Sequence, residues 1–181
     1  ATRIYQVDEC TNVFAARSLA TSKILGAADL FQAILSWFVR TASRSEDLFA
    51  SARFVMLEIF WLNVFLIALA TRERIFSRAG LAALVGAATL APLWDYGLEV
   101  RHDNLLLTGL LLTWCLVRLR PAGLQAYFVI GAVAVILQFV AFKSFVYTVP
   151  ISVAILVLPP LGFNSPRWKL VLAWVAGVLG A

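Results

Sequence analysis

The sequence predicts an all-α fold: a polytopic bundle of transmembrane helices with one amphipathic helix lying along the membrane interface. Of the 181 residues, 62% are hydrophobic and only 14% are charged, which is too few charges to cover a soluble domain of this size. Long apolar runs are separated by short loops that hold most of the twelve arginines, a pattern typical of integral membrane proteins. We therefore expect membrane lipids to surround most of the chain.

Residues 1–45 are the polar part of the chain, and we interpret them as an outward-facing segment. This segment contains the acidic motif Asp8-Glu9, and two carboxylates in a first helical turn also suit the helix dipole, so a structural and a chemical role are both open. A second helix is expected over 30–40, with polar residues three and four apart on one stripe. Because it is too short to span a bilayer, we predict that it lies at the interface with Trp37 at headgroup depth, the alternative being packing against protein.

Residues 46–181 are predicted to form the transmembrane bundle, with about five complete spans and a sixth that is cut off. The apolar runs begin near residues 46, 79, 105, 121, 145 and 170. Glu58 lies inside the first span, and an acid at that depth usually faces a bundle interior or a partner, here Arg53 or Asn63. We expect the 181 residues to be part of a longer protein.

Basic residues gather in alternate loops of this bundle. The loops at 72–78, 118–120 and 164–169 hold seven Arg or Lys, whereas those at 95–103 and near 143 hold two. The positive-inside rule puts the first set in the cytoplasm. Helix counting then brings residues 1–45 and 95–103 together on the opposite face. We accordingly interpret the net charge of +5 as a topology signal, and expect no nucleic-acid partner.

A second polar motif, Glu99-Val-Arg101-His102-Asp103-Asn104, lies between two predicted spans. Together with Asp8-Glu9, Ala15-Ala-Arg17-Ser18 and Ala52-Arg53, it resembles motifs of the GT-C superfamily of membrane glycosyltransferases. The likeness is greatest to the bacterial branch related to protein O-mannosyltransferases and lipid A aminoarabinose transferases. It covers about residues 1–120 and lacks the helix that such enzymes carry before the acidic pair.

The resemblance implies transfer of a sugar from a polyprenyl-phosphate donor to an acceptor at the periplasmic face of a bacterial inner (cytoplasmic) membrane. Asp8 would be the catalytic base that deprotonates an acceptor hydroxyl, with Glu9 as the fallback. Cationic and polar side chains would contact the donor phosphate and its sugar. These implied substrate-binding residues are Arg101, His102, Lys143 and Tyr147.

A divalent metal ion bridging carboxylates to the phosphate is a further expectation, with Asp8, Asp103 and His102 as its ligands; no other cofactor is implied. Two alternatives remain open. The second motif would be an ordinary solvated loop if Arg101 simply pairs with Glu99 or Asp103. The whole chain would be a non-catalytic transmembrane subunit of a larger membrane complex if it has kept only the scaffold of such an enzyme.

Overall fold

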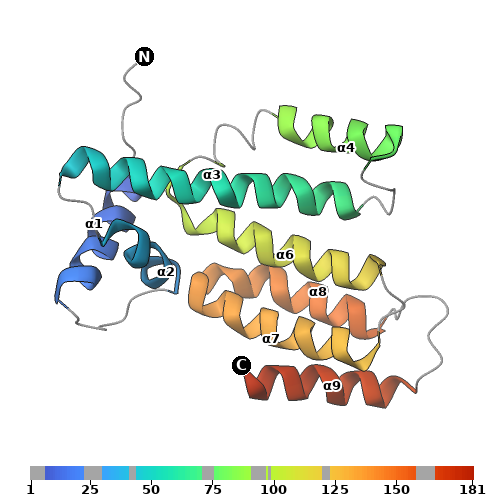
Figure 1. The fold of residues 1–181 in the computed structure, drawn as a ribbon. Helices are drawn as coiled ribbons and strands as arrows, with labels where there is room; N and C mark the ends of the chain where they lie inside the picture. The colour runs from blue at the N-terminus through green and yellow to red at the C-terminus, as the bar shows by residue number, and fades with distance from the viewer. Residues whose placement is uncertain are drawn as a thin grey trace.

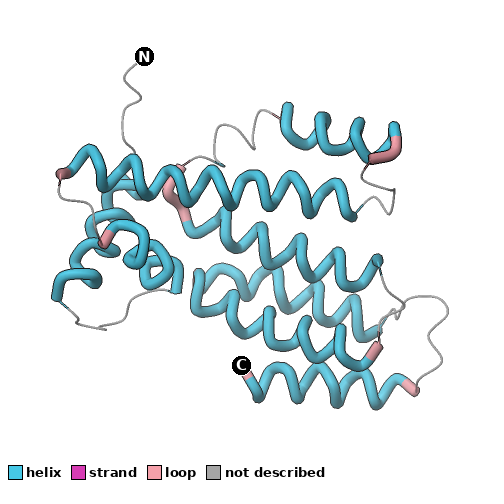
Figure 2. Tube along the Cα trace, viewed as in Figure 1, coloured by secondary structure: helices cyan, strands magenta, loops and turns pink. Residues whose placement is uncertain are grey.

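The computed structural model describes residues 7–22, 30–40, 44–70, 76–90, 97, 99–119, 123–157 and 166–181. Within these ranges the regular elements are all helices, without a strand, so the predicted all-α class is confirmed (Figure 2). The elements are α1 (Val7–Ser22), α2 (Leu30–Val39), α3 (Ser45–Ala70), α4 (Arg78–Thr89), α6 (His102–Leu119), α7 (Leu124–Val140), the short 3-10 helix η1 (Phe142–Ser144), α8 (Phe145–Val157) and α9 (Arg167–Gly180).

The helices α3, α6, α7, α8 and α9 run side by side, with α4 beside α3, while α1 and α2 lie at one end of this stack (Figure 1). The starts of α6 and α8 lie at the same end, because Asn12 of α1 contacts Val100 and Lys143 of η1 contacts Asp103. We call α1, α2, residues 99–103 and η1 the ionic end. Helix counting had predicted that these distant polar segments share one face, and the structure brings them together.

α3 is the element that best fits a membrane span. It has 26 residues, about 39 Å at 1.5 Å per residue, and among the described helices it is the one long and apolar enough to cross a bilayer. The shorter apolar helices α4, α6, α7 and α8 begin within about three residues of the predicted spans, and α8 has only 13 residues. The structure therefore supports a single candidate span, Glu46–Ala70, by length and composition.

α2 forms where the amphipathic helix was predicted. It buries Phe31, Leu35 and Val39, spaced four apart, in a core shared with α1 and α3, and leaves Trp37 78% exposed. Arg17 of α1 donates to the carbonyl oxygens of Val39 and Arg40 at 3.0 and 2.9 Å, which satisfies acceptors that a helix C-terminus leaves free. The helix thus packs on protein along one side, and its position at a membrane surface stays a prediction.

Polar contacts join α3 to α6. The Asn63 side chain donates to the Asn104 carbonyl at 3.3 Å and accepts from the Thr108 hydroxyl at 2.8 Å. Asn104 itself donates to the carbonyls of Gly97 and Glu99 at 3.2 and 3.0 Å, and one end of the 99–104 segment is thereby fixed to the start of α6. Asn63 and Asn104 are buried, so these bonds satisfy groups that water cannot reach.

Glycines join α7 to α9. Gly131 and Gly177 are both buried where the two helices meet. A Cβ atom on Gly131 would collide with the carbonyl oxygen of Trp174, and one on Gly177 would collide with that of Phe128. The absent side chains let the two backbones touch, as in membrane helix pairs built on small residues.

Candidate functional site

Glu9 is held in an ion pair that connects α1 to α3. Its side chain is 1% exposed, and its two oxygens accept from Nε and Nη2 of Arg53 at 2.7 and 2.8 Å. Such a bidentate pair is among the strongest charge-assisted contacts in proteins. Because one guanidinium engages both oxygens, the geometry gives Glu9 a structural contact with α3, and its catalytic role stays a prediction.

Asp8 precedes Glu9 in the first turn of α1, and its side chain lies outside the described part of the structure. Its role as a base therefore stays a prediction. One turn later, the Asn12 amide donates to the Val100 carbonyl at 3.0 Å across a buried contact. The helix that carries the acidic pair thus directly contacts the second polar motif.

Three of the four predicted substrate-binding residues surround Asp103. Arg101 Nη2 lies 3.2 Å from Oδ2, His102 Nε2 lies 3.6 Å from Oδ1, and the Lys143 ammonium donates to Oδ1. Arg101 Nη1 also lies 3.6 Å from Oε2 of Glu99, so Arg101 pairs with both acids, as the alternative of an ordinary solvated loop expects. Phe31 of α2 packs edge-on against the His102 ring, at 6.5 Å between centroids. We call Arg101, His102, Asp103 and Lys143 the Asp103 cluster.

The electrostatics of the Asp103 cluster are set by its cations. Partial burial by itself would raise the pKa of Asp103, but the hydrogen bond from Lys143 and the charges of His102, Lys143 and Arg101 outweigh it and hold this pKa below its usual range. All four side chains remain partly exposed. Arg101 and Lys143 have more N–H donors than one carboxylate can use, so they can also bind an incoming anion.

Of the three predicted metal ligands, His102 and Asp103 lie together, and the Asp8 side chain is outside the described residues. Asp103 is already surrounded by cationic groups, which would repel a divalent metal ion. The described chain contains no group of three His, Cys, Asp or Glu side chains placed to share a metal, and the Asp8 side chain is outside it. These residues do not fit a metal site, and we derive no chemical step through one.

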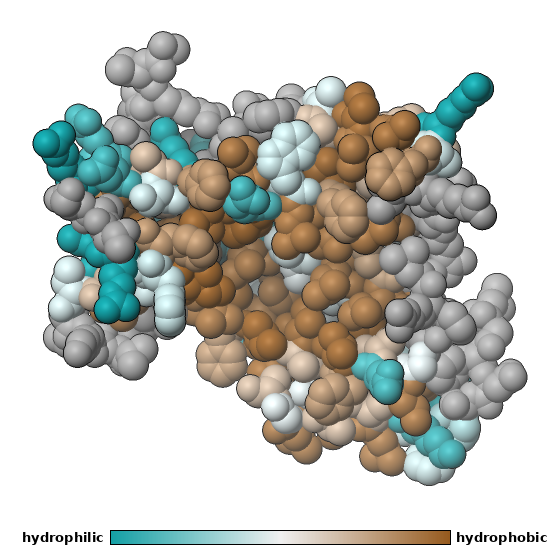
Figure 3. All heavy atoms as spheres, in the orientation of Figure 1, coloured by the Kyte–Doolittle hydropathy of each residue, from teal (hydrophilic) through white to brown (hydrophobic). Residues whose placement is uncertain are grey.

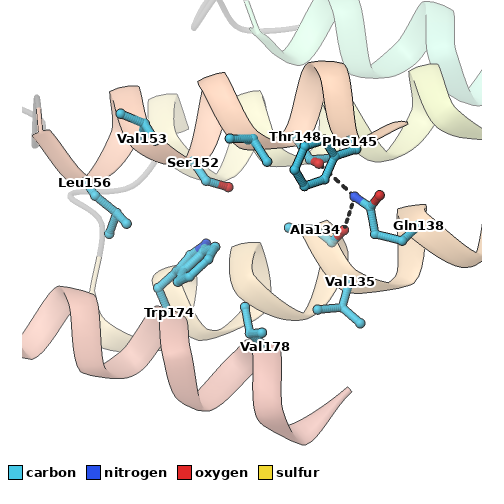
Figure 4. Close-up of a pocket in the computed structure, with 11 residues that line it drawn as sticks. Ala134, Val135, Gln138, Phe145, Thr148, Ser152, Val153, Leu156, Trp174 and Val178 are labelled. Atoms are coloured by element: carbon cyan, nitrogen blue, oxygen red, sulfur yellow. Dashed lines mark hydrogen bonds between the residues drawn. The ribbon is translucent and has the colours of Figure 1, made fainter. Parts of the chain in front are cut away.

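An apolar groove, reached along the chain from Lys143 of this cluster, was not predicted from the sequence. It has a volume of about 380 Å³, within the range of ligand pockets, and lies between α7, α8 and α9 (Figure 4). Phe145, at its start, follows Lys143 by only two residues, and Gln138 stands in the last turn of α7. The lining residues are Ala134, Val135, Gln138, Phe145, Thr148, Val149, Ser152, Val153, Leu156, Trp174 and Val178.

A few polar groups mark the otherwise apolar wall of the groove. Gln138 donates to the Thr148 hydroxyl at 2.8 Å (Figure 4). The indole N–H of Trp174 is buried and has no acceptor among the described residues. Gln138, Thr148 and Ser152 interrupt apolar runs, which was the one signal in the sequence that could have located the groove. Tyr147, the fourth predicted substrate-binding residue, is half exposed on α8 and does not line it.

Comparison with protein families, curated proteins and solved structures finds no match to this chain. The Asp103 cluster and the adjoining groove are therefore the observations from which a function can be argued.

Proposed function

We propose that this chain forms part of a membrane glycosyltransferase of the GT-C type and binds a polyprenyl-phosphate sugar donor. The observation that carries the proposal is the position of the Asp103 cluster beside an apolar groove. A polyprenyl phosphate has the two matching parts, an anionic head for the cations and a long apolar chain for the groove.

Exposed apolar side chains support placing the shorter helices in the membrane together with α3. Phe139, Val146 and Leu179, on α7, α8 and α9, are all more than 60% exposed. On the face seen in Figure 3, apolar residues cover the middle of the molecule, and hydrophilic residues gather towards α1 and α2. A soluble protein rarely exposes so much contiguous apolar surface. We propose a polytopic bundle in a bacterial inner membrane, with the ionic end at the periplasmic surface.

The proposed reaction transfers the sugar from a phosphate oxygen to an acceptor hydroxyl. The acceptor hydroxyl attacks the anomeric carbon of the sugar, the bond from that carbon to the phosphate oxygen breaks, and polyprenyl phosphate leaves with the electron pair. The hydroxyl proton passes to the base, for which we propose Asp8. Arg101, His102 and Lys143 would stabilise the charge that develops on the leaving phosphate. In the free protein Asp103 keeps these three side chains together, and the phosphate would compete with it.

Binding of polyprenyl phosphate to the chain in lipid nanodiscs tests the first half of the proposal. Lys143→Gln should weaken binding by about 10- to 100-fold, the value of one hydrogen bond to a charged group. Lys169→Gln is the matched control, because Lys169 is at the start of α9 and stacks over Trp168, away from the cluster. Equal affinities of Lys143→Gln and the unmodified chain would refute donor binding at this site.

The rate of sugar transfer tests the second half of the proposal, in which Asp8 is the base. Asp8→Asn should leave donor binding unchanged and lower the rate of sugar transfer by roughly 10²–10⁴-fold. Arg101→Lys keeps the charge but loses the guanidinium fork, so it should weaken donor binding while the chain still folds. Sugar transfer by Asp8→Asn at the unmodified rate would eliminate Asp8 as the base.

The second candidate function is that of a non-catalytic membrane subunit. It is favoured by the Glu9–Arg53 pair, which turns one of the two N-terminal acids into a structural element. A chain that binds polyprenyl phosphate but transfers no sugar, with Asp8 intact, would indicate this alternative.

A further inference from the structure

We infer that the outer face of α3 docks a transmembrane helix of another protein, and that this helix carries a lysine or arginine near its middle. The inference concerns Glu58 and the exposed side chains around it. It rests on α3 as a membrane span, and it is independent of sugar transfer.

Glu58 stands at the midpoint of the candidate span Glu46–Ala70 and is exposed. Large apolar side chains three, four and seven positions from it share its helix face. These exposed neighbours are Phe54, Trp61, Leu62 and Phe65. We call this set, with Glu58, the Glu58 stripe.

The other sides of α3 are already occupied. Arg53 contacts α1, Asn63 contacts α6, and Phe60 and Val64 pack with Ala87 of α4. The Glu58 stripe is the side of α3 that no described helix covers. It therefore faces either lipid or another molecule.

The prediction that Glu58 pairs with Arg53 or Asn63 is wrong. Arg53 binds Glu9, and Asn63 binds Asn104 and Thr108. Each lies five positions from Glu58 on the same helix, about 140° around its axis at 3.6 residues per turn, so neither shares the face of Glu58. No described residue forms an ion pair with Glu58. A carboxylate at this depth is unfavourable in hydrocarbon, and charged groups inside membranes usually pair with one another.

The charge of Glu58 and the geometry of a two-fold pair indicate which kind of molecule covers the Glu58 stripe. A cation is the group that complements Glu58, and the aromatic faces of Trp61 and Phe65 in the next turns would also attract it. A second copy of the chain is disfavoured: because Glu58 is at the midpoint of the span, either a parallel or an antiparallel two-fold pair would set Glu58 against Glu58. A basic residue at the middle of a different helix meets both requirements.

The test uses the whole chain in lipid vesicles with fluorescent synthetic helices of leucine and alanine. One peptide has a central lysine, and its matched partner has a central glutamine. Energy transfer from a label at the N-terminus of the chain should show association of the lysine peptide at least about tenfold stronger than that of the glutamine peptide. Glu58→Gln should remove this preference.

Asp47→Asn is the control variant, because Asp47 is exposed on the same side of α3 but in its first turn. It should retain the full lysine preference, and Trp61→Leu should reduce it. Equal association of the two peptides, or a lysine preference that survives Glu58→Gln, would overturn the inference.

Photo-crosslinking in native membranes adds an independent readout. A crosslinking residue at position 61 or 65 should capture an apolar peptide with a Lys or Arg near its centre, identified by mass spectrometry. Capture of lipid alone, or of a second copy of this chain through α3, would overturn the inference.

Discussion

The two parts of the helix stack are held together by different contacts. From α1 to α6, buried polar groups make the connections, through Glu9–Arg53, Asn12–Val100 and Asn63–Thr108. Between α7 and α9, the connection is a close backbone approach at Gly131 and Gly177. In a bilayer, apolar burial contributes little to the association of helices, because lipid is as apolar as leucine. Polar contacts thus connect α1, α3 and α6, whereas the α7–α9 pair is connected by close backbone packing.

The difference has a functional consequence. Directional hydrogen bonds fix residues 99–104 against α1 and α3, so the charged groups of the Asp103 cluster are held at defined positions. The glycine contact is close but not directional, and the apolar groove opens between the helices it joins and α8. A defined charged site beside an adaptable apolar one suits a ligand with a charged head and a flexible chain.

The largest expected effect in this comparison comes from breaking the Glu9–Arg53 pair. Glu9→Gln should lower the free energy of unfolding by about 3 kcal/mol, the lower end of the range for a buried ion pair, because Arg53 keeps some exposure to solvent. Unfolding in detergent, followed by circular dichroism, measures it. Glu58→Gln is the control on the same helix and should change the stability of the isolated chain little.

A double variant sharpens this prediction. Glu9→Gln combined with Arg53→Gln should cost less than the two single changes added together, since no uncompensated charge is left behind. Strict additivity would show that the two side chains do not stabilise each other.

A smaller effect is expected from the glycine contact. Gly177→Leu should lower the free energy of unfolding by about 1–3 kcal/mol, because the new side chain has to push α9 away from the Phe128 carbonyl. Gly86→Leu in α4 is the matched control, since a Cβ there meets no atom within 4 Å. Leucine has a higher helix propensity than glycine, so Gly86→Leu should not destabilise the chain. If both variants change the free energy of unfolding by the same amount, the close contact at Gly177 contributes nothing.

Sequence reasoning recovered the helices well and their contacts poorly. Apolar runs ended by Gly, Pro and Arg locate the helices, because each run has to bury or shield one continuous surface. Helix counting also placed residues 99–103 and Lys143 at one end, which depends only on chain direction. The rotation of each helix about its own axis was not predicted. It decides that Arg53 faces Glu9 of α1 and that Asn63 faces Thr108 of α6, and it is set by packing between helices far apart in the sequence.

The groove escaped prediction for the same reason. Its wall comes from three helices, and Trp174 meets Ser152 and Thr148 only after α9 has docked on α7. Gly131 and Gly177 are 46 positions apart, and the small residues Ala173, Gly177 and Ala181, spaced four apart, do not by themselves identify α7 as the partner of α9. Predicted site residues drawn from one short motif, Arg101, His102 and Asp103, lie together because chain proximity already requires it.

The smallest expected effect is a loss of stability at low pH, which should occur at the Asp103 cluster and not at the contact of α7 with α9. Because the pKa of Asp103 is lowered in the folded protein, its ion pairs stabilise the fold above the unfolded pKa, near 3.8, and this contribution disappears as the pH falls through the lower folded value. The pairs are partly exposed, so the contribution should be about 0.2–1 kcal/mol.

Hydrogen exchange should detect this loss locally. On lowering the pH from 6 towards 3, the first turn of α6 should lose protection in the unmodified chain, and Asp103→Asn should lack that acid-dependent part of the loss. The difference between the unmodified chain and Asp103→Asn is the quantity to compare. The contact of α7 with α9 has no titrating group at Gly131 or Gly177, so its protection should stay the same in both. An equal loss at α9 would mean that the two parts unfold as one cooperative unit, and that their different contacts do not give them separate stabilities.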